Sequence, residues 1–378
     1  MIDTRTSSPS EDSAGESWFA LLGRRDTPVD GVEDYCTYLG QALARRGISL
    51  KVERVEWADG GWLNALFQLL RNCVEWRGKW VLLQYTALSW SRRGFPMGAL
   101  VTLAILRRRG ARCAVVFHEP FGLSGPRLID HIRGAFQNWI VRALFRHADK
   151  SIFTAPLHTI TWLPKDSANA TFIPIGANIP DPAARPPATA DRNGAGKTVA
   201  IFCLSEPPNL QNELDDISRA VHAAAKDGAN LRVVFLGKGT AEAKYEIESA
   251  FDRIPVELSN LGLQDAGEIS RVLAESDVML CVRGLLFPRR GSALAGIACG
   301  LPIIGYAGAA DGTPLTEAGI ELVPYRDSEA MGRALARVLG DGDLHKTLVE
   351  RSRRAYTEYF SWDFIAGAFI DYLESRPA

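Results

Sequence analysis

Two alternating residue patterns constrain the fold of this chain more than any other feature. Runs of six to eight apolar and β-branched residues alternate with longer segments whose apolar residues recur at three- and four-residue steps. The first pattern is typical of buried strands and the second of amphipathic helices. Their regular alternation predicts parallel sheets covered by helices on both faces. We expect strands within 18–23, 50–57, 80–85, 113–118, 150–155, 170–176, 198–204, 231–237, 256–262, 277–282, 301–306 and 320–325.

The alternation is interrupted once, and the interruption predicts the domain organisation. Residues 178–197 are rich in Pro, Ala and Gly and have no periodicity, so we interpret them as a linker. We therefore predict an α/β protein with two doubly wound, Rossmann-like domains facing a cleft, at 17–177 and 198–360. The amphipathic segment within 361–378 is predicted to cross back to the first domain. The polar residues 1–16 lack the apolar core of a signal peptide and predict a disordered tail.

Composition excludes several classes of protein. The net charge of −1 argues against bulk nucleic-acid binding, which usually needs a strongly basic domain. No apolar run approaches the roughly 20 residues of a spanning helix. Six cysteines are scattered without a metal-ligand pattern, so we expect reduced thiols, no metal site and a cytoplasmic protein. The apolar residues 97–106 lie between arginine clusters within 92–110. They predict peripheral contact with the inner face of a membrane, or equally an ordinary core helix with charged ends.

Ligands of doubly wound sheets bind beyond the carboxyl ends of the strands. Gly31 follows the first predicted strand, where a missing side chain lets backbone N–H groups approach a ligand. The alternative is an ordinary turn in which Asp30 caps the following helix. No GxGxxG motif follows this strand, which argues against a dinucleotide-dependent oxidoreductase.

Two later loops of the first half carry further candidates. His118 and Glu119 directly follow a predicted strand, and a histidine there can exchange hydrogen bonds with a ligand near neutral pH. The alternative is a structural histidine at the end of the strand, whose hydrogen bonds are satisfied within the protein. Tyr85, Arg92 and Arg93 lie in or beside the loop after 80–85 and are candidates for the acceptor side of the cleft, although arginine pairs are often merely solvated.

In the second half the candidates point to a phosphate. Gly237 and Gly239 follow a strand, where two glycines allow a nucleotide to lie against the backbone and a tight turn alone explains one. Two arginines then precede a helix start. Free helical N–H groups and guanidinium groups together suit a diphosphate, because arginine binds phosphate through two parallel hydrogen bonds. The alternative is a solvated arginine pair. The predicted diphosphate-binding residues are Arg289, Arg290, Gly291 and Ser292.

The order of motifs over residues 17–376 resembles the GT-B glycosyltransferases of family 4. The motifs that carry the resemblance are "DGVEDYCTYLGQALARRG", "HADKSIFTA", "IPIGANI", "VVFLGKG", "ELSNLGLQDAGEISRVLAESDVML", "ACGLPII" and "SWDFIAGAFIDYLES". The resemblance implies retaining, metal-independent transfer of a sugar from a nucleotide diphosphate donor, with no cofactor. It implies a saccharide or lipid-linked acceptor and a role in polysaccharide or glycoconjugate synthesis. His118 matches the family's histidine near the donor sugar and is the predicted catalytic residue, and Gly31 matches its first-domain glycine and is predicted to bind the donor. Glu119 is predicted to lie on the acceptor side or in the cleft.

Two departures from the family's pattern favour a second hypothesis. The family's paired glutamates around the phosphate-binding helix are replaced by Phe287 and Ala295, and "CLSEPPNLQNE" lacks its usual Arg and Lys. The "RRGS" sequence resembles a variant subgroup in which an arginine pair precedes the helix. The second hypothesis is a non-catalytic GT-B protein that binds a sugar nucleotide or a protein partner.

Overall fold

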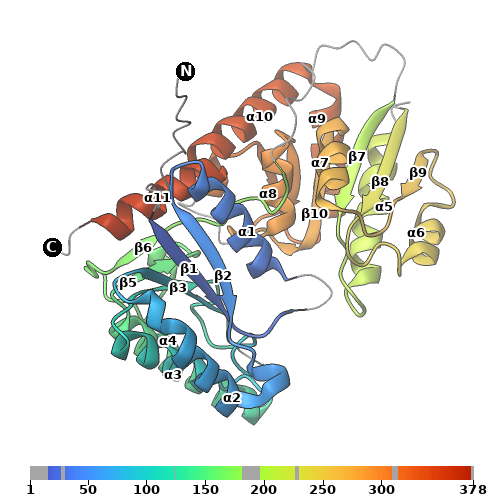
Figure 1. Ribbon diagram of the computed structural model, residues 1–378. Coiled ribbons are helices and arrows are strands. Elements are labelled where there is room, and N and C mark those ends of the chain that lie inside the picture. The colour runs from blue at the N-terminus through green and yellow to red at the C-terminus, as the bar shows by residue number, and fades with distance from the viewer. Residues whose placement is uncertain are drawn as a thin grey trace, which may run out of the picture. The chain divides into compact units, whose positions relative to one another are not determined.

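A computed structural model describes residues 16–26, 30–123, 125–180, 196–225, 230–308 and 314–375. The chain divides into two compact units, one formed by 1–173 with 366–378 and the other by 174–365 (Figure 1). Nearly all of the predicted tail, 1–16, and most of the predicted linker, 178–197, lie outside the described residues.

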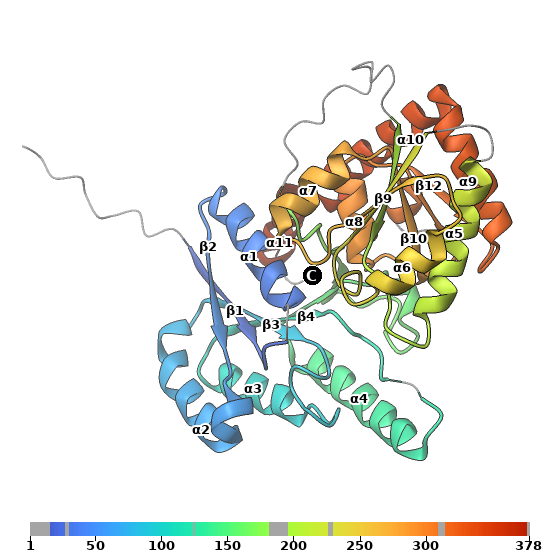
Figure 2. The same ribbon diagram turned by 90° about the vertical axis from the view of Figure 1, so that its right-hand side faces the viewer.

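The first unit is built on a six-stranded, all-parallel sheet of order β2-β1-β3-β4-β5-β6. Its strands are β1 (Ser17–Leu22), β2 (Ser49–Arg54), β3 (Trp80–Tyr85), β4 (Arg112–Phe117), β5 (Lys150–Phe153) and β6 (Ala170–Phe172). The helices are α1 (Gly31–Ala44), α2 (Trp57–Asn72), α3 (Met97–Arg108) and α4 (Leu128–His147). Figures 1 and 2 show α2, α3 and α4 on one face of the sheet and α1 on the other. The central strands are buried on both faces, which explains their continuous apolar runs.

The second unit contains another six-stranded, all-parallel sheet, of order β12-β11-β10-β7-β8-β9. Its strands are β7 (Lys197–Phe202), β8 (Leu231–Leu236), β9 (Glu257–Asn260), β10 (Val278–Leu285), β11 (Ile303–Tyr306) and β12 (Ile320–Val323). One core cluster joins this sheet to α5 (Leu210–Ala225), α6 (Lys244–Phe251) and α9 (Ser328–Gly340). A second cluster joins it to α7 (Ala266–Glu275) and α8 (Gly291–Ala298), so helices cover both faces.

The predicted fold class is confirmed in its α/β character and its two parallel sheets, because each expected apolar run contains a strand. One strand runs further than predicted. β10 continues past Val282 to Leu285, with an irregular register that includes Gly284 at a φ of +68°. No helix in the described part of the chain is long and apolar enough to cross a membrane.

The chain returns to the first unit near its C-terminal end. After α10 (Gly342–Ala355), helix α11 (Trp362–Glu374) begins in the second unit, where Trp362 Nε1 donates to the Ala177 carbonyl at 2.7 Å. From residue 366 onward the helix belongs to the first unit. There the Tyr372 hydroxyl donates to the Ser151 carbonyl at 3.4 Å, and Lys150 Nζ donates to Ser375 Oγ at 3.0 Å.

Each sheet has one position where the strand order reverses. In the first sheet it lies between β1 and β3, and in the second between β7 and β10. The loops leaving two such strands diverge to opposite faces of the sheet and leave a crevice at the carboxyl ends of the strands. Ligand sites are therefore expected at these two reversal points.

Candidate functional site

The reversal point of the first sheet holds a cavity of about 320 Å³. Its walls come from the loops after β1 and β3, the start of α1, the end of β2 and the loop after β4. The lining residues are Leu22, Gly23, Arg24, Asp26, Asp30, Gly31, Val32, Arg54, Gln84, Thr86, Leu88, Ser89 and Glu119. Two of them, Gly31 and Glu119, are among the residues that the sequence singled out.

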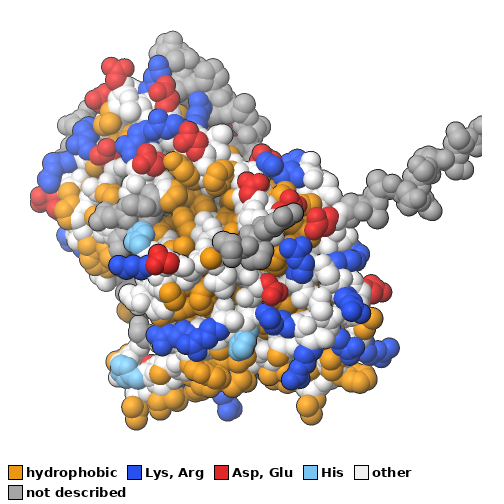
Figure 3. All heavy atoms as spheres, turned by 90° about the vertical axis from the view of Figure 1, so that its left-hand side faces the viewer, with side chains coloured by type: hydrophobic (Ala, Val, Ile, Leu, Met, Phe, Trp, Pro, Cys, Tyr) orange, Lys and Arg blue, Asp and Glu red, His pale blue; other side chains and the backbone are white. Residues whose placement is uncertain are grey.

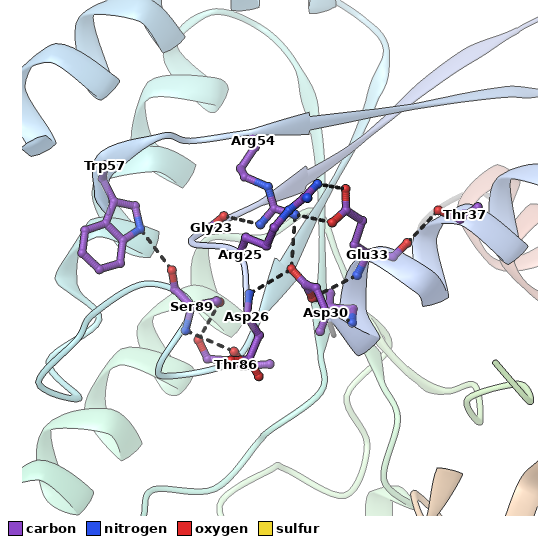
Figure 4. Close-up of polar contacts among 11 residues, drawn as sticks. Gly23, Arg25, Asp26, Asp30, Glu33, Thr37, Arg54, Trp57, Thr86 and Ser89 are labelled. Atoms are coloured by element: carbon purple, nitrogen blue, oxygen red, sulfur yellow. Dashed lines mark hydrogen bonds and ion pairs between the residues drawn. The ribbon is translucent and has the colours of Figure 1, made fainter. Parts of the chain in front are cut away.

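An ion-pair network forms one side of this cavity (Figure 4). Arg54 Nη2 lies 3.2 Å from Asp30 Oδ2 and 3.2 Å from Glu33 Oε2, while Arg54 Nη1 donates to the Gly23 carbonyl at 2.8 Å. Asp30 also accepts hydrogen bonds from the backbone N–H groups of Val32 and Glu33, at 3.1 and 3.2 Å, so it caps α1 as the alternative interpretation expected. The arginine charge is thus balanced within the protein, and the same contacts hold Asp30 at the start of α1, beside Gly31.

His118 lies one hydrogen bond away from the cavity. Its Nε2 is 2.8 Å from Gln84 Oε1, and Gln84 lines the cavity. The imidazole stands edge-on to the Tyr35 ring, with 5.0 Å between the ring centroids. Glu119 is held by the backbone, since its Oε2 accepts from the Ala87 N–H at 3.2 Å. The structure therefore brings Gly31, Glu119 and His118 into one neighbourhood.

Of the remaining candidates of the first unit, Tyr85 adjoins this group, since its carbonyl accepts from the His118 N–H at 3.0 Å, and the arginine pair lies apart. Tyr85 is completely buried, its ring packs against Phe117, and burial holds the pKa of its hydroxyl well above the ordinary range. Its hydroxyl has no hydrogen-bond partner among the described residues, and its role in acceptor binding stays a prediction. Arg92 and Arg93 are exposed and line a separate cavity between α2 and α3.

The reversal point of the second sheet is marked by two arginines, Arg283 at the end of β10 and Arg290 at the N-cap of α8. The Arg290 guanidinium lies 4.4 Å from the Phe287 ring centroid, and its Nη2 donates to the Leu285 carbonyl at 3.3 Å. Both arginines and Ser292 border a hollow of only about 10 Å³. A ligand here would therefore lie on the surface of the unit rather than inside it.

No described carboxylate forms an ion pair with either arginine, although Glu213 acts on Arg290 from a longer distance. Neither Arg283 nor Arg290 has a described carboxylate within 4.0 Å, and Arg283 Nε is a buried donor without a hydrogen-bond partner in the described structure. Burial and, after it, the positive charge of Arg283 lower the pKa of Arg290. Two neighbouring guanidinium groups at a helix N-terminus are stabilised by an anion, because each N–H group and each charge there favours one.

Other predicted residues of the second unit surround this pair. Gly291 begins α8, and Arg289 precedes the N-cap residue. Gly237 and Gly239 have φ angles of +90° and +85°; a Cβ would lie 2.7 Å from the Phe202 ring and 2.6 Å from the Leu204 carbonyl oxygen, respectively. The backbone alone therefore requires glycine at both positions, and their contact with a nucleotide stays a prediction.

Sequence reasoning missed Arg283. The residue directly follows the run 277–282, so the same positional argument that singled out His118 would have found it. In the structure Arg283 also lines an adjoining cavity of about 180 Å³ with Ser205, Asn209, Asn212, Glu213, Asp216, Val282, Gly284, Tyr325 and Arg326. Across the described residues, no three His, Cys, Asp or Glu side chains gather as metal ligands would.

Two Rossmann-like units with all-parallel sheets define the GT-B fold, and comparison with solved structures supports that class. A glycosyltransferase of Rickettsia africae aligns with a TM-score of 0.68 and 12% identity, over 96% of this chain and 100% of that chain. HepE of Anabaena, in complex with UDP and glucose, aligns with a TM-score of 0.66 and 14% identity, over 96% and 100%.

The same fold also occurs outside the transferases. A Listeria monocytogenes structure named for UDP-N-acetylglucosamine 2-epimerase aligns with a TM-score of 0.61 and 13% identity, over 96% of this chain and 99% of that chain. No family model and no curated protein sequence matches the chain. At these identities the comparisons establish the fold, and the chemistry must be argued from the residues.

Proposed function

We propose that this chain is a retaining, metal-independent glycosyltransferase that moves a sugar from a nucleotide diphosphate donor to a saccharide or lipid-linked acceptor, in polysaccharide or glycoconjugate synthesis. The observation that carries the proposal is the pair Arg283 and Arg290 at the reversal point of the second sheet, which forms no ion pair with a described carboxylate and in which Arg283 Nε is a buried donor without a described partner. The presence of UDP in the HepE structure supports the class of donor.

In this proposal the second unit binds the donor. Arg283, Arg290 and the first N–H groups of α8, which helix geometry leaves without intrahelical acceptors, bind the diphosphate. As the bond from the anomeric carbon to the diphosphate oxygen breaks, negative charge accumulates on the leaving diphosphate, and the fixed guanidinium groups stabilise it. The acceptor hydroxyl bonds to the same face of that carbon, and its proton leaves with the diphosphate.

The first unit then binds the acceptor and the transferred sugar. The cavity beside Gly31 carries carboxylates, amides and hydroxyls, which suit the hydroxyl groups of a saccharide. His118, held by Gln84, hydrogen-bonds the sugar under transfer. The imidazole therefore acts in the transfer step and does not contribute to binding of the diphosphate.

A specific observation favours a second candidate, a non-catalytic GT-B protein that binds a sugar nucleotide or a protein partner. The two positions at which the resembling family has glutamates hold Phe287, whose ring lies against Arg290, and Ala295, which is only 2% exposed. Neither residue supplies a carboxylate to a ribose or a sugar hydroxyl.

One pair of measurements separates the candidates. Calorimetry with UDP, GDP, ADP and dTDP identifies the base, and sugar release from the matching nucleotide sugars then measures turnover. A transferase binds one of the diphosphates and releases sugar from the matching nucleotide sugar. The His118→Ala variant should still bind the diphosphate but should no longer release sugar. The control variant His222→Ala, at an exposed position, should change neither binding nor sugar release. Binding without turnover by the unaltered chain identifies the second candidate. Binding of none of the four diphosphates overturns both.

A further inference from the structure

The surface formed by α2 and α3 contains a cavity that the proposed function does not use. The aromatic cavity, as we name it, has a volume of about 490 Å³ and opens to solvent. Its lining residues are Trp57, Trp62, Leu66, Trp90, Ser91, Arg92, Arg93, Phe95, Met97, Gly98 and Val101.

Indole rings form the wall of the aromatic cavity. Trp57 and Trp62 stack with 5.0 Å between ring centroids and 5° between ring planes. The N–H groups of Trp57 and Trp90 are already used, since they donate to the carbonyls of Ser89 and Gln84 at 3.0 and 2.8 Å. These two indoles thus leave only ring surface for a ligand, and an apolar chain fits such a wall better than a sugar does.

Apolar residues continue from the cavity onto the open surface. Leu63 and Phe67 lie one turn apart on α2 and are 89% and 60% exposed, while Met97 and Val101 on α3 are 40% and 37% exposed. In Figure 3, hydrophobic side chains gather along the lower margin, at the level where Figure 1 shows α2, α3 and α4. Helix α4 adds exposed Leu128, Ile129, Ile132 and Trp139.

The same helical layer is strongly cationic. Residues 57–147, which contain these helices together with β3 and β4, have thirteen Lys and Arg against four Asp and Glu, although the whole chain has a net charge of −1. Two of these arginines are paired, Arg107 with Asp149 and Arg133 with Asp130. Helix α3 contains no acidic residue. At the rim of the cavity, Arg92 Nη2 donates to the Ala58 carbonyl at 2.9 Å, and neither Arg92 nor Arg93 pairs with a described carboxylate. Apolar side chains surrounded by arginines are complementary to a bilayer that carries negative headgroups.

We propose that the α2–α3 surface docks this protein on an anionic phospholipid bilayer, with one lipid chain in the aromatic cavity and the lipid phosphate on Arg92 and Arg93. Leu63, Phe67, Met97 and Val101 enter the boundary between headgroups and acyl chains. The proposal concerns a surface of the first unit and does not depend on the proposed donor site in the second.

Co-sedimentation of the full chain with phospholipid vesicles tests this at low ionic strength. Vesicles of phosphatidylcholine with phosphatidylglycerol should bind the protein, and vesicles of phosphatidylcholine alone should bind it at least tenfold more weakly. Arg92→Gln/Arg93→Gln should weaken binding to the anionic vesicles about thirtyfold, at about 1 kcal/mol per arginine. Leu63→Ser/Phe67→Ser should weaken it to a similar or greater extent.

Matched variants of the second unit serve as controls. Arg253→Gln/Arg333→Gln and Tyr245→Ser alter exposed residues there and should leave vesicle binding unchanged. Circular dichroism and urea denaturation verify that each variant is folded. Equal binding to neutral and anionic vesicles, or unchanged binding by folded α2–α3 variants, would overturn the proposal. A change of oligomeric state in Leu63→Ser/Phe67→Ser without vesicle binding by the unaltered chain would instead identify a second copy as the occupant.

Discussion

The two units use the same topological position for opposite electrostatic purposes. In the first unit Arg54 stands between Asp30 and Glu33, and its charge is balanced by the fold itself. In the second unit Arg283 and Arg290 stand near each other, and neither forms an ion pair with a described carboxylate. Both pairs of loops diverge from a reversal of strand order. The sheet therefore fixes where a ligand binds, and the residues after the strands decide what charge it carries.

The difference separates residues that stabilise the fold from residues held for a ligand. A partly buried arginine with two carboxylates adds to stability only while its partners are present. A partly buried arginine without a carboxylate partner lowers stability until an anion binds, and such stability costs are typical of functional sites. Three substitution experiments follow from this contrast.

The largest expected effect concerns the donor anion. Arg283→Ala/Arg290→Ala should weaken nucleoside diphosphate binding by about 3–6 kcal/mol, a hundredfold or more, because charge-assisted hydrogen bonds contribute about 1.5–3 kcal/mol each. Binding of the nucleoside without phosphates should be unchanged. Calorimetry measures both, with exposed Arg333→Ala as the matched control. An Arg289→Ala/Arg290→Ala variant that loses more would show that Arg289 and not Arg283 completes the site.

The second effect is on stability and has opposite signs in the two units. Arg54→Leu should lower the free energy of unfolding by about 3 kcal/mol, because it leaves Asp30, whose side chain is 8% exposed, beside Glu33 without a counter-charge. Arg283→Leu should leave that free energy unchanged or raise it. Urea denaturation of the unliganded protein measures both. Equal losses in the two variants would contradict the distinction drawn between the units.

The smallest effect isolates the charge of a helix cap. Asp30→Asn keeps a capping side chain for α1 but removes the ion pair with Arg54, and should cost about 1–2 kcal/mol. Asp265 caps α7 by accepting from the Glu268 N–H at 2.9 Å and has no described basic partner. Asp265→Asn should therefore cost about 0.5 kcal/mol or less. Thermal unfolding measures the change in midpoint temperature of the Asp30→Asn and Asp265→Asn variants. Similar changes in the two variants would mean that the ion pair with Arg54 adds nothing to stability.

The strands could be predicted because a parallel strand that is buried on both faces appears in the sequence as a continuous apolar run followed by a turn residue. The Arg54 network could not be predicted, since it depends on the register that sets Leu22 of β1 beside Arg54 of β2. Arg283 directly follows the predicted run 277–282 and could have been found by position; what the sequence does not show is that β10 continues to Leu285 and brings Arg283 near Arg290. The aromatic cavity depends on the packing of α2 against α3, and the sequence alone does not specify that contact.

The return of the chain through α11 has a consequence for synthesis on the ribosome. Translation proceeds from the N-terminus, and domains generally fold as units as they emerge. All residues of the second unit, 174–365, leave the ribosome before Tyr372 and Ser375, which contact Ser151 and Lys150 of the first unit. The unit that is translated first is therefore the last to receive all of its contacts.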